Sequence, residues 1–343
     1  MFAAGREDEF ELRTSGKTYV EIAAGGGGIL SSVRGVRAAS KEQLLELVLG
    51  RLERFLDLGT TTLEAKSGYG LSLEAELKSL EVLRDAREHG GVDIVSTFLG
   101  AHEFPEEYRE RRADYVQVLL DEWLPRVAES RLAEYADVFT EKHVFDLDAS
   151  RALMERARSL GLRLRMHVDQ LSALGGAELA AELRADSADH LEFASDAGIA
   201  ALAEAGVVAV LCPLVPLYLR VDREAPARRM IEAGVPVAIS TDFNPGSCPM
   251  QSLPEVMTWA ALRYRMSAAE CLTAATLNPA CSLGRGAEIG SLEPGKRADL
   301  VIFSCSRLNQ LVAGFGASPV RAVIVRGRVA RGGEHLRTPQ AVS

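Results

Sequence analysis

Histidine is scarce in this chain, and its placement suggests chemistry. Only six histidines occur among 343 residues, and four of them stand where a predicted β-strand ends: His102, His143, His167 and His190. Asp242 ends the last predicted strand of the same series. Imidazole and carboxylate together suit zinc or iron as ligands. A catalytic zinc normally has at least three protein ligands, so the residues alone leave open both a metal site and a set of hydrogen-bonded structural histidines.

These side chains need a framework that brings strand ends together, and the apolar pattern predicts one. Short runs rich in Val, Ile, Leu and Thr alternate with amphipathic segments, which is the pattern of a parallel sheet covered by helices. Polar residues at the strands' carboxyl ends favour an α/β fold of the (β/α)8 TIM-like barrel type, because that face carries active sites. The predicted strands are 60–66, 93–101, 136–143, 162–168, 187–192, 207–213 and 235–242. The predicted helices are 41–58, 73–89, 114–130, 149–160, 175–183 and 196–205.

The strand count is one short of a closed barrel. We count seven strands from Thr60 onward, whereas a barrel of this type closes with eight. The region Met1–Arg37 is charged and then glycine-rich, and it is predicted to be loop-like. We therefore expect the first barrel strand to lie upstream of Met1. The run Gly25–Gly28 follows no clear strand and has no evident acidic ribose partner, so a dinucleotide site is not predicted.

The C-terminal part differs in character from the barrel region. Turn-rich sequence from Gly286 to Gly295 precedes two predicted strands, 298–303 and 320–325, and Val329 extends or follows the second. We interpret these strands as part of a small β-sandwich module appended to the barrel. The expected division is a catalytic barrel domain at 1–284 and the module with a polar, poorly ordered tail at 285–343.

Composition excludes several other classes of protein. The formal net charge is −9, and no useful Lys/Arg cluster interrupts it, which argues against nucleic acid as a partner. No apolar stretch approaches the roughly 18–20 residues of a membrane span, and the N-terminus has no signal-peptide layout. The five cysteines are odd in number and form no CxxC pair, so a disulfide framework is not expected. A reducing cytoplasm fits this pattern.

Six short stretches combine glycine with polar or titratable residues, most of them at strand ends: 25–29, 66–70, 100–102, 167–170, 188–191 and 241–247. Together they resemble the imidazolonepropionase family of the amidohydrolase superfamily. The Lys-Ser-Gly-Tyr-Gly and Asp-Phe-Asn-Pro-Gly segments are fairly specific to that family, and the similarity extends from about Phe2 to about Gly332. The segment from Gly290 to Val301 is shared widely across the superfamily and discriminates little.

The resemblance implies an activity and a set of roles. The activity is hydrolysis of the ring amide of 4-imidazolone-5-propanoate to N-formimidoyl-L-glutamate in histidine degradation, with one divalent metal, zinc or iron, in a cytoplasmic homodimer. A metal would acidify its bound water toward a pKa of about 7 and polarise the carbonyl. His167 and Asp242 match metal ligands, Asp242 also serves as the base, and His190 assists proton transfer or stabilises the oxyanion. The matching substrate-binding positions are Arg6, Tyr19, Tyr69, His102, Gln170, Asn244, Gly246 and Ser247.

Among these positions, Arg6 is expected to pair with the substrate's propionate through a charge-assisted contact. Tyr69 and Asn244 offer neutral hydrogen bonds, and Gly246 lets the backbone approach closely. His143 and Lys66 also follow strands, and we keep them as supporting groups, with Glu141 as an expected partner of one of them.

One departure from the family pattern agrees with the strand count. The family's His-x-His ligand pair follows the first strand, and no His-x-His occurs in this chain. We expect the pair to precede Met1, in a full-length protein that starts further upstream and is a working hydrolase. The chain itself is then expected to bind metal weakly and to turn over little substrate, because only His167 and Asp242 remain as ligands.

Two alternatives remain open. The first is a related metal-dependent ring deaminase. Such enzymes commonly place a carboxylic acid three residues after the histidine at position 167, where Gln170 cannot titrate, which weakens this interpretation. The second is an inactive fragment or a binding protein that retains the pocket. A barrel that lacks a strand has unpaired sheet edges, which favour pairing with another chain.

Overall fold

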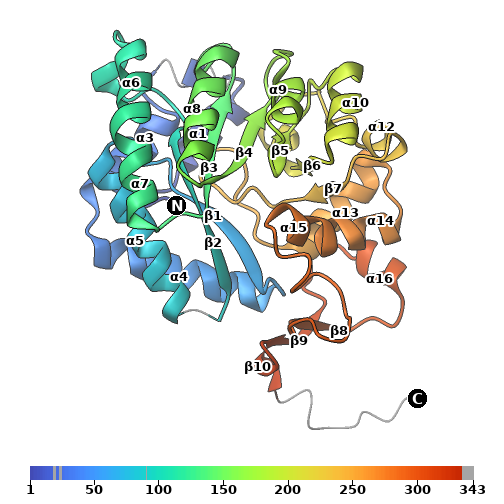
Figure 1. Ribbon diagram of the computed structural model, residues 1–343. Helices are drawn as coiled ribbons and strands as arrows, with labels where there is room; N and C mark the ends of the chain where they lie inside the picture. The colour runs from blue at the N-terminus through green and yellow to red at the C-terminus, as the bar shows by residue number, and fades with distance from the viewer. Residues whose placement is uncertain (18–20, 23–24, 90, 334–343) are drawn as a thin grey trace.

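Seven parallel strands lie side by side in chain order and form one curled sheet, as Figure 1 shows. The computed structural model describes residues 1–17, 21–22, 25–89 and 91–333. Among these residues, the edge strands β1 and β7 each pair on one side only, so the sheet is an incomplete barrel. The predicted fold class and the count of seven strands are confirmed. The strands are β1 (Thr62–Lys66), β2 (Asp93–Ala101), β3 (Tyr135–Thr140), β4 (Arg163–Val168), β5 (Ser187–His190), β6 (Val208–Leu211) and β7 (Val237–Ile239).

Helices cover the outer face of this sheet. Their starts follow local rules: Ser40 and Gln43 form a reciprocal capping box at α4, and Asp146 accepts from Ala149 N at the start of α8. The helices of the strand-helix alternation are α4 (Lys41–Asp57), α5 (Leu73–His89), α6 (Arg112–Val118), the π-helix η2 (Leu119–Trp123), α7 (Leu124–Ser130), α8 (Leu147–Ser159), α9 (Gly176–Glu182) and α10 (Asp196–Ala205). Further elements are the 3-10 turn η1 (Glu106–Tyr108), α11 (Leu214–Leu219), α12 (Ala227–Glu232), α13 (Leu253–Tyr264), α14 (Ala268–Ala275) and α15 (Leu277–Ser282).

The N-terminal region is helical, and the prediction that Met1–Arg37 is loop-like was wrong. It contains α1 (Glu7–Thr14) and α3 (Ile29–Ala38). Helix α1 buries Glu9 and Arg13 instead of an apolar stripe, so the periodicity that identifies most helices is missing from its sequence. Helix α1 therefore buries charged side chains against the loop at Gly246 and the turn at Gly28.

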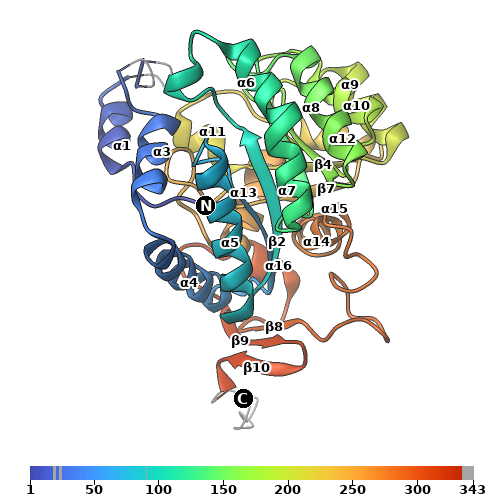
Figure 2. The same ribbon diagram turned by 60° about the vertical axis from the view of Figure 1, so that its left-hand side comes forward.

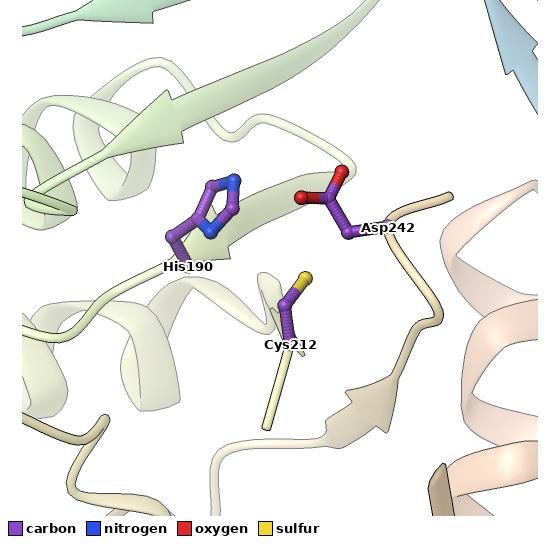
Figure 3. Close-up of side chains that lie close together, drawn as sticks. All are labelled: His190, Cys212 and Asp242. Carbon is purple, nitrogen blue, oxygen red and sulfur yellow. The ribbon is translucent and has the colours of Figure 1, made fainter. Parts of the chain in front are cut away.

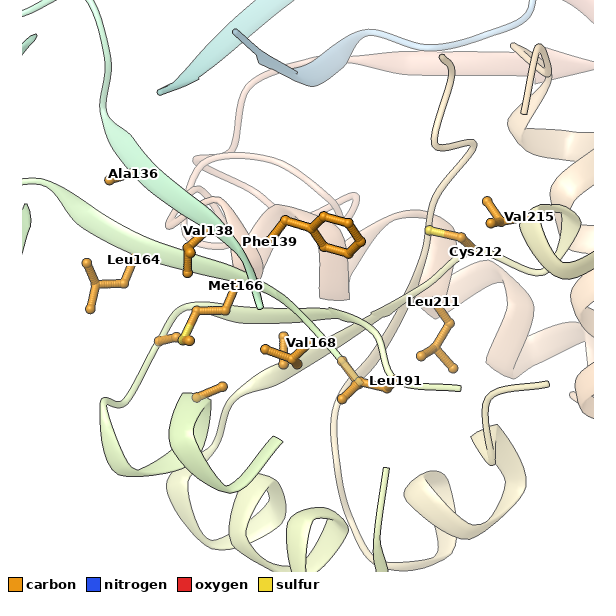
Figure 4. Packing of buried hydrophobic residues seen from close by; sticks show 14 of the residues in the cluster. Ala136, Val138, Phe139, Leu164, Met166, Val168, Leu191, Leu211, Cys212 and Val215 are labelled. Carbon is orange, nitrogen blue, oxygen red and sulfur yellow. The ribbon is translucent and has the colours of Figure 1, made fainter. Parts of the chain in front are cut away.

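The core lies between the sheet and its helices. Val138, Leu164 and Met166 are fully or almost fully buried there, and Figure 4 shows them on one side of β3 and β4, with Phe139 projecting from the other. Each such side chain contributes roughly 1.5–3 kcal/mol by leaving water. Because neighbours along a strand point to opposite faces, residues between these positions, such as His167, face the barrel interior.

A second sheet follows the barrel. It is antiparallel, with strand order β10-β9-β8, and both views place it below α4 and far from α1 (Figures 1 and 2). Arg297 Nη1 donates to Asp93 Oδ2 at 2.8 Å, which ties it to the start of β2, opposite the carboxyl ends of the barrel strands. The strands predicted at 298–303 and 320–325 are confirmed, and Val329 lies in a separate strand. The elements are β8 (Leu300–Phe303), α16 (Leu308–Val312), β9 (Val320–Val325) and β10 (Arg328–Arg331).

Most of the predicted polar tail at the C-terminus, residues 334–343, lies outside the described residues. Within the described part of the chain, none of the helices has both the length and the apolar character that crossing a membrane requires.

Candidate functional site

One cavity opens at the carboxyl ends of the barrel strands. It encloses about 810 Å³, its mouth included, and Lys66, Ile29, Leu99 and Phe139 form part of its wall. The structure brings ten of the predicted site residues together around it, while Tyr19 lies outside the described residues. These ten are Arg6, Tyr69, His102, His167, Gln170, His190, Asp242, Asn244, Gly246 and Ser247.

Several strand ends adopt a backbone conformation that is uncommon for residues other than glycine. The φ angles of Asp169, His190 and Asp242 are 50°, 77° and 46°. Such conformations cost free energy and persist where the surrounding structure holds them. For Asp169 the support is visible, because its carboxylate accepts backbone N–H groups from Leu174 to Ala177 at 2.8–3.1 Å. This turn fixes the direction of the chain directly after His167.

A network of buried charges lies beneath the cavity. Lys66 Nζ lies 2.7 Å from both Glu64 Oε1 and Asp137 Oδ2, and 3.5 Å from Asp189 Oδ2. Arg165 Nε lies 3.1 Å from Glu64 Oε1. Five charged groups from four strands thus compensate one another inside the barrel, where an unpaired charge would be costly.

His167 is oriented by this network. Its Nδ1 lies 2.9 Å from Asp137 Oδ2, whose side chain is completely buried. Burial lowers the pKa of His167, but the charge and the hydrogen bond of Asp137 together outweigh it and hold that pKa above its ordinary value. A histidine that directs Nδ1 toward a carboxylate presents Nε2 as its ligand atom. The geometry therefore suits His167 for binding a metal through Nε2.

Asp242 is held by the loop that follows it. Asn244 Nδ2 donates to the carbonyl oxygen of Asp242 at 2.7 Å and to its Oδ2 at 3.1 Å. Asn244 Oδ1 accepts from the backbone N–H groups of Gly246 and Ser247. Burial raises the pKa of Asp242 to about 6. Asn244 thus organises this loop, and through it the position of the Asp242 carboxylate.

The other two histidines of the cavity are uncharged at neutral pH. Burial lowers the pKa of His102 to about 4 and that of His190 to about 3. His102 Nδ1 lies 2.8 Å from the carbonyl oxygen of Gly68. It therefore donates there, which leaves Nε2 as an acceptor.

Two arginines at or in helix α1 lie close to the loop at Gly246: Arg6, the N-cap residue, which lines the cavity, and Arg13 within the helix. Arg6 Nε donates to Glu9 Oε2 at 2.9 Å, and a Cβ atom on Gly246 would overlap the Arg6 guanidinium. Arg13 Nη1 donates to the carbonyl oxygen of Gly246 at 2.5 Å. The glycine at 246 thus permits a close approach between the loop and α1.

The residues around the cavity fit a divalent metal by the chemistry of their ligand atoms. Among the residues that the structure describes, two groups of three side chains place their ligand atoms within 4.8 Å of one another: Asp137, His167 and Asp189, and separately His190, Cys212 and Asp242. The predicted ligands His167 and Asp242 belong to different groups, although both line the same cavity. Imidazole nitrogen and carboxylate oxygen are ligands that zinc and iron accept.

Sequence reasoning missed the interior charges and misassigned Glu141. We expected Glu141 to pair with His143 or Lys66, but its carboxylate accepts from Leu171 N at 2.7 Å and from Ser172 Oγ at 2.6 Å. Lys66 instead binds acidic side chains within the barrel. The missed residues are Glu64, Asp137, Arg165, Asp189, Glu192 and Cys212, and for the first four the available signal was a charge at an inward position of an apolar strand.

Glu192→Gln is expected to make the protein more stable at neutral and alkaline pH. Glu192 is 2% exposed, neither carboxylate oxygen has a hydrogen-bond partner among the described residues, and burial raises its pKa to about 8. Between the ordinary value of 4.5 and 8, the unfolded state binds fewer protons, so stability falls by up to about 1.4 kcal/mol per pH unit. The amide removes this loss. Urea unfolding at pH 4 and pH 8 measures it.

The control for this prediction is Glu204→Gln, because Glu204 is exposed on α10. It should leave the pH dependence of the unfolding free energy unchanged. If Glu192→Gln gives the same loss of stability from pH 4 to pH 8 as the unmodified chain, Glu192 is ionised without cost and its burial has been misjudged.

The fold and the site define a class of protein. A curled α/β barrel sheet whose strand ends gather imidazoles and carboxylates in one cavity is the layout of metal-dependent barrel hydrolases. The family model described as "Amidohydrolase family" matches residues 21–331. Among solved structures, a mutant of the atrazine chlorohydrolase of Arthrobacter aurescens, complexed with zinc and atraton, is similar with a TM-score of 0.71 and 18% identity, covering 95% of this chain and 80% of that one. An adenosine deaminase from Xanthomonas campestris with bound zinc has a TM-score of 0.64 and 22% identity, covering 86% and 71%. At these identities the likeness concerns the fold.

Relatives with curated names are much closer in sequence. The imidazolonepropionase of Symbiobacterium thermophilum is 51% identical over 329 residues, covering 96% of this chain and 77% of the relative. That of Solibacter usitatus is 50% identical over 328 residues, covering 96% and 78%. The chain therefore belongs to the amidohydrolase family and, within it, to the imidazolonepropionases, as its motifs indicated. The family is metal-dependent, and its members are hydrolases that act on small molecules.

Proposed function

We propose that this chain hydrolyses the ring amide of 4-imidazolone-5-propanoate to N-formimidoyl-L-glutamate in histidine degradation. The observation that carries the proposal is the combination of 51% identity to a named imidazolonepropionase with ten matching side chains around one cavity. An adventitious set of residues would not be expected to converge from six separate segments of the chain.

The substrate's propionate is proposed to bind at the α1 side of the cavity. Glu9 holds Nε and Nη2 of Arg6 and thereby orients the guanidinium, whose Nη1 edge faces Gly246 in the cavity wall. A carboxylate there gains a charge-assisted hydrogen bond. Tyr69 and His102, whose rings are 5.1 Å apart, are proposed to contact the imidazolone ring, and Gln170, Asn244 and Ser247 complete the polar wall.

The proposed cofactor is one divalent ion, zinc or iron, held by His167 and Asp242. When bound, it supplies Lewis-acid polarisation of the ring carbonyl and a more acidic water. Asp137 keeps His167 in the orientation that this role requires, through the contact at its Nδ1.

The proton movements are assigned to Asp242 and His190. Water oxygen bonds to the carbonyl carbon while the Asp242 carboxylate takes a proton from that water. The carbon–nitrogen bond then breaks, and Asp242 passes the proton to the departing nitrogen. His190 is uncharged, so it is proposed to orient the water or donate a hydrogen bond to the developing oxyanion. One water is consumed for each ring that opens.

The test is an assay of the purified chain with added zinc or Fe²⁺. Because only His167 and Asp242 are expected as metal ligands, we expect slow turnover, in which the imidazolone absorbance decreases, formimidoylglutamate appears in equal amount and no ammonia is released. Ammonia released from a panel of purines and pyrimidines, with imidazolonepropanoate untouched, would instead identify a ring deaminase. If neither substrate class reacts on folded, metal-loaded protein, the proposal is wrong for this chain.

Arg6→Gln is expected to raise the KM for imidazolonepropanoate by about 10- to 100-fold, with a smaller effect on kcat. The lost hydrogen bond to a charged group is worth about 1.5–3 kcal/mol, and 1.4 kcal/mol corresponds to about tenfold. Steady-state kinetics measures the change. Arg34→Gln is the control, since the Arg34 side chain is 57% exposed. An unchanged KM in Arg6→Gln would place the propionate elsewhere.

The remaining features of the proposal concern the protein's setting. We propose a cytoplasmic homodimer in which residues 1–284 form the catalytic barrel domain and residues 285–343 the appended module. Five free cysteines among the described residues support a reducing compartment.

A further inference from the structure

We propose that His190, Cys212 and Asp242 form a binding site for one thiophilic divalent cation, such as Cd²⁺ or Zn²⁺. The proposed hydrolysis uses His190 and Asp242 but has no role for the thiol of Cys212. Figure 3 shows the three side chains directed toward a common space between them. This site shares Asp242 with the proposed catalytic ion but takes His190 and Cys212 in place of His167.

The three side chains come from three neighbouring strand ends. His190 is the last residue of β5, Cys212 directly follows β6, and Asp242 follows β7. Because parallel strands end at the same edge of a sheet, residues far apart in sequence meet here. Both His190 and Cys212 are buried, at 3% and 4% exposure, so the thiol and the imidazole are held inside the barrel and not at the surface. The site is therefore built by the barrel itself.

The spacing of the ligand atoms suits an ion with little rearrangement. The nitrogen, sulfur and oxygen atoms lie within 4.8 Å of one another. Zinc bonds of about 2.0–2.3 Å at tetrahedral angles separate ligand atoms by roughly 3.3–3.8 Å. Side-chain rotations that close the gaps by about 1 Å are enough, and larger Cd²⁺ needs less movement.

Sulfur makes the site selective. Thiolate is a soft ligand that favours zinc and related ions over Mg²⁺ or Ca²⁺, and binding displaces the thiol proton. The other group of three, Asp137, His167 and Asp189, contains no sulfur and already surrounds Lys66 Nζ. A soft cation is thus expected to prefer the group that contains Cys212.

Occupation has a functional consequence, which rests on the proposed function. A cation bound here takes the carboxylate of Asp242 and the imidazole of His190 away from the water and the substrate. Excess Cd²⁺ or Zn²⁺ should therefore inhibit the hydrolase in a manner that requires Cys212. Binding itself is independent of that activity, so the two claims are tested separately.

The binding test is a titration of the metal-free chain with Cd²⁺, followed by ultraviolet thiolate-to-cadmium charge transfer. Exposed Cys281 and half-buried Cys305 are first replaced by serine so that they do not contribute. We expect a band that saturates at one ion per chain. Cys212→Ser should abolish it, and Cys248→Ser, which removes a buried thiol outside the group, should leave it unchanged. Absence of the band, or a band that survives Cys212→Ser, overturns the proposal.

Two further variants keep the test decisive. If Cys212→Ser does not fold, His190→Asn and Asp242→Asn retain the thiol, and each should weaken Cd²⁺ binding at least tenfold. Unchanged affinity in both refutes the three-residue site. In the activity arm, inhibition by Cd²⁺ that persists in Cys212→Ser rejects the inhibitory consequence alone, whereas a chain with no turnover at all rejects the proposed function and leaves the binding result standing.

Discussion

Asp242→Asn is expected to lower kcat for imidazolonepropanoate by at least about 10²–10⁴-fold, the usual contribution of a positioned general base. The proposed mechanism asks the Asp242 carboxylate to take a proton from water and return it to the departing nitrogen. An amide of the same shape does neither, and it is a weaker metal ligand. Asn244 and Ser247, which donate to Asp242 Oδ2 at 3.1 and 3.4 Å, still find an acceptor oxygen there.

Stability separates this loss from misfolding. Burial raises the pKa of Asp242 to about 6, so in the metal-free protein the ionised carboxylate lowers the free energy of unfolding at pH 8. A neutral side chain of the same shape should therefore leave the protein at least as stable. Turnover, metal content and the urea midpoint are therefore measured together. Asp222→Asn, an exposed site, is the matched control and should retain activity. Turnover like that of the unmodified chain in Asp242→Asn would contradict the assignment of the base.

The long regular elements were predictable from sequence because single local patterns define them. Helix α5 (Leu73–His89) and strand β2 (Asp93–Ala101) have the predicted bounds. The first is a long amphipathic run, and the second is mostly apolar and buried throughout, as expected for a strand covered on both faces. Strand β7 is shorter than predicted, Val237–Ile239 instead of 235–242, because its polar end leaves the sheet to form the loop at Asp242.

Helix α1 was not predictable by the same rule. Its inward face carries Glu9 and Arg13, which are buried through contacts with the loop at Gly246 and the turn at Gly28. Nothing in the eight residues of α1 signals that Arg13 will donate to a carbonyl oxygen 233 positions away. Tertiary contacts, not local propensity, determine this helix.

The candidate site was predictable where one residue at a strand end carries the signal, and not where two distant residues act together. The resemblance supplied Arg6, Tyr69 and Gln170, and the cavity collects them. The pair of Lys66 and Asp137 is 71 positions apart. Only the order of β1, β2 and β3 in the sheet makes them neighbours, so a charge within an apolar strand could be noticed but its partner could not be named.

This buried pair is the basis of the second large effect. Asp137→Asn is expected to lower the free energy of unfolding by about 3 kcal/mol, the lower end of the range for breaking a buried ion pair. Asp137 has a fully buried side chain and contacts both Lys66 and His167, at 2.7 and 2.9 Å. The loss should stay at the lower end because Lys66 keeps Glu64 at 2.7 Å.

The matched control is Asp186→Asn. Asp186 pairs with Arg163 at the other end of the same sheet, but that pair is 25% and 41% exposed, so the expected loss is below about 1 kcal/mol. Urea unfolding of both variants, with zinc removed, gives the comparison. Equal stabilities in the two variants would show that the interior network is as weakly coupled as a surface pair.

A second substitution tests whether the uncompensated charge causes the loss. Adding Lys66→Met to Asp137→Asn removes the cation that has lost one of its carboxylate partners, so the double variant should be more stable than the sum of the two single effects, by about 1–3 kcal/mol of coupling. Metal binding should not recover with it. Asp137 also orients His167, and loss of such a partner typically weakens metal affinity by about 10- to 100-fold. Zinc affinity that returns together with stability would mean that Asp137 acts on the site only through the fold.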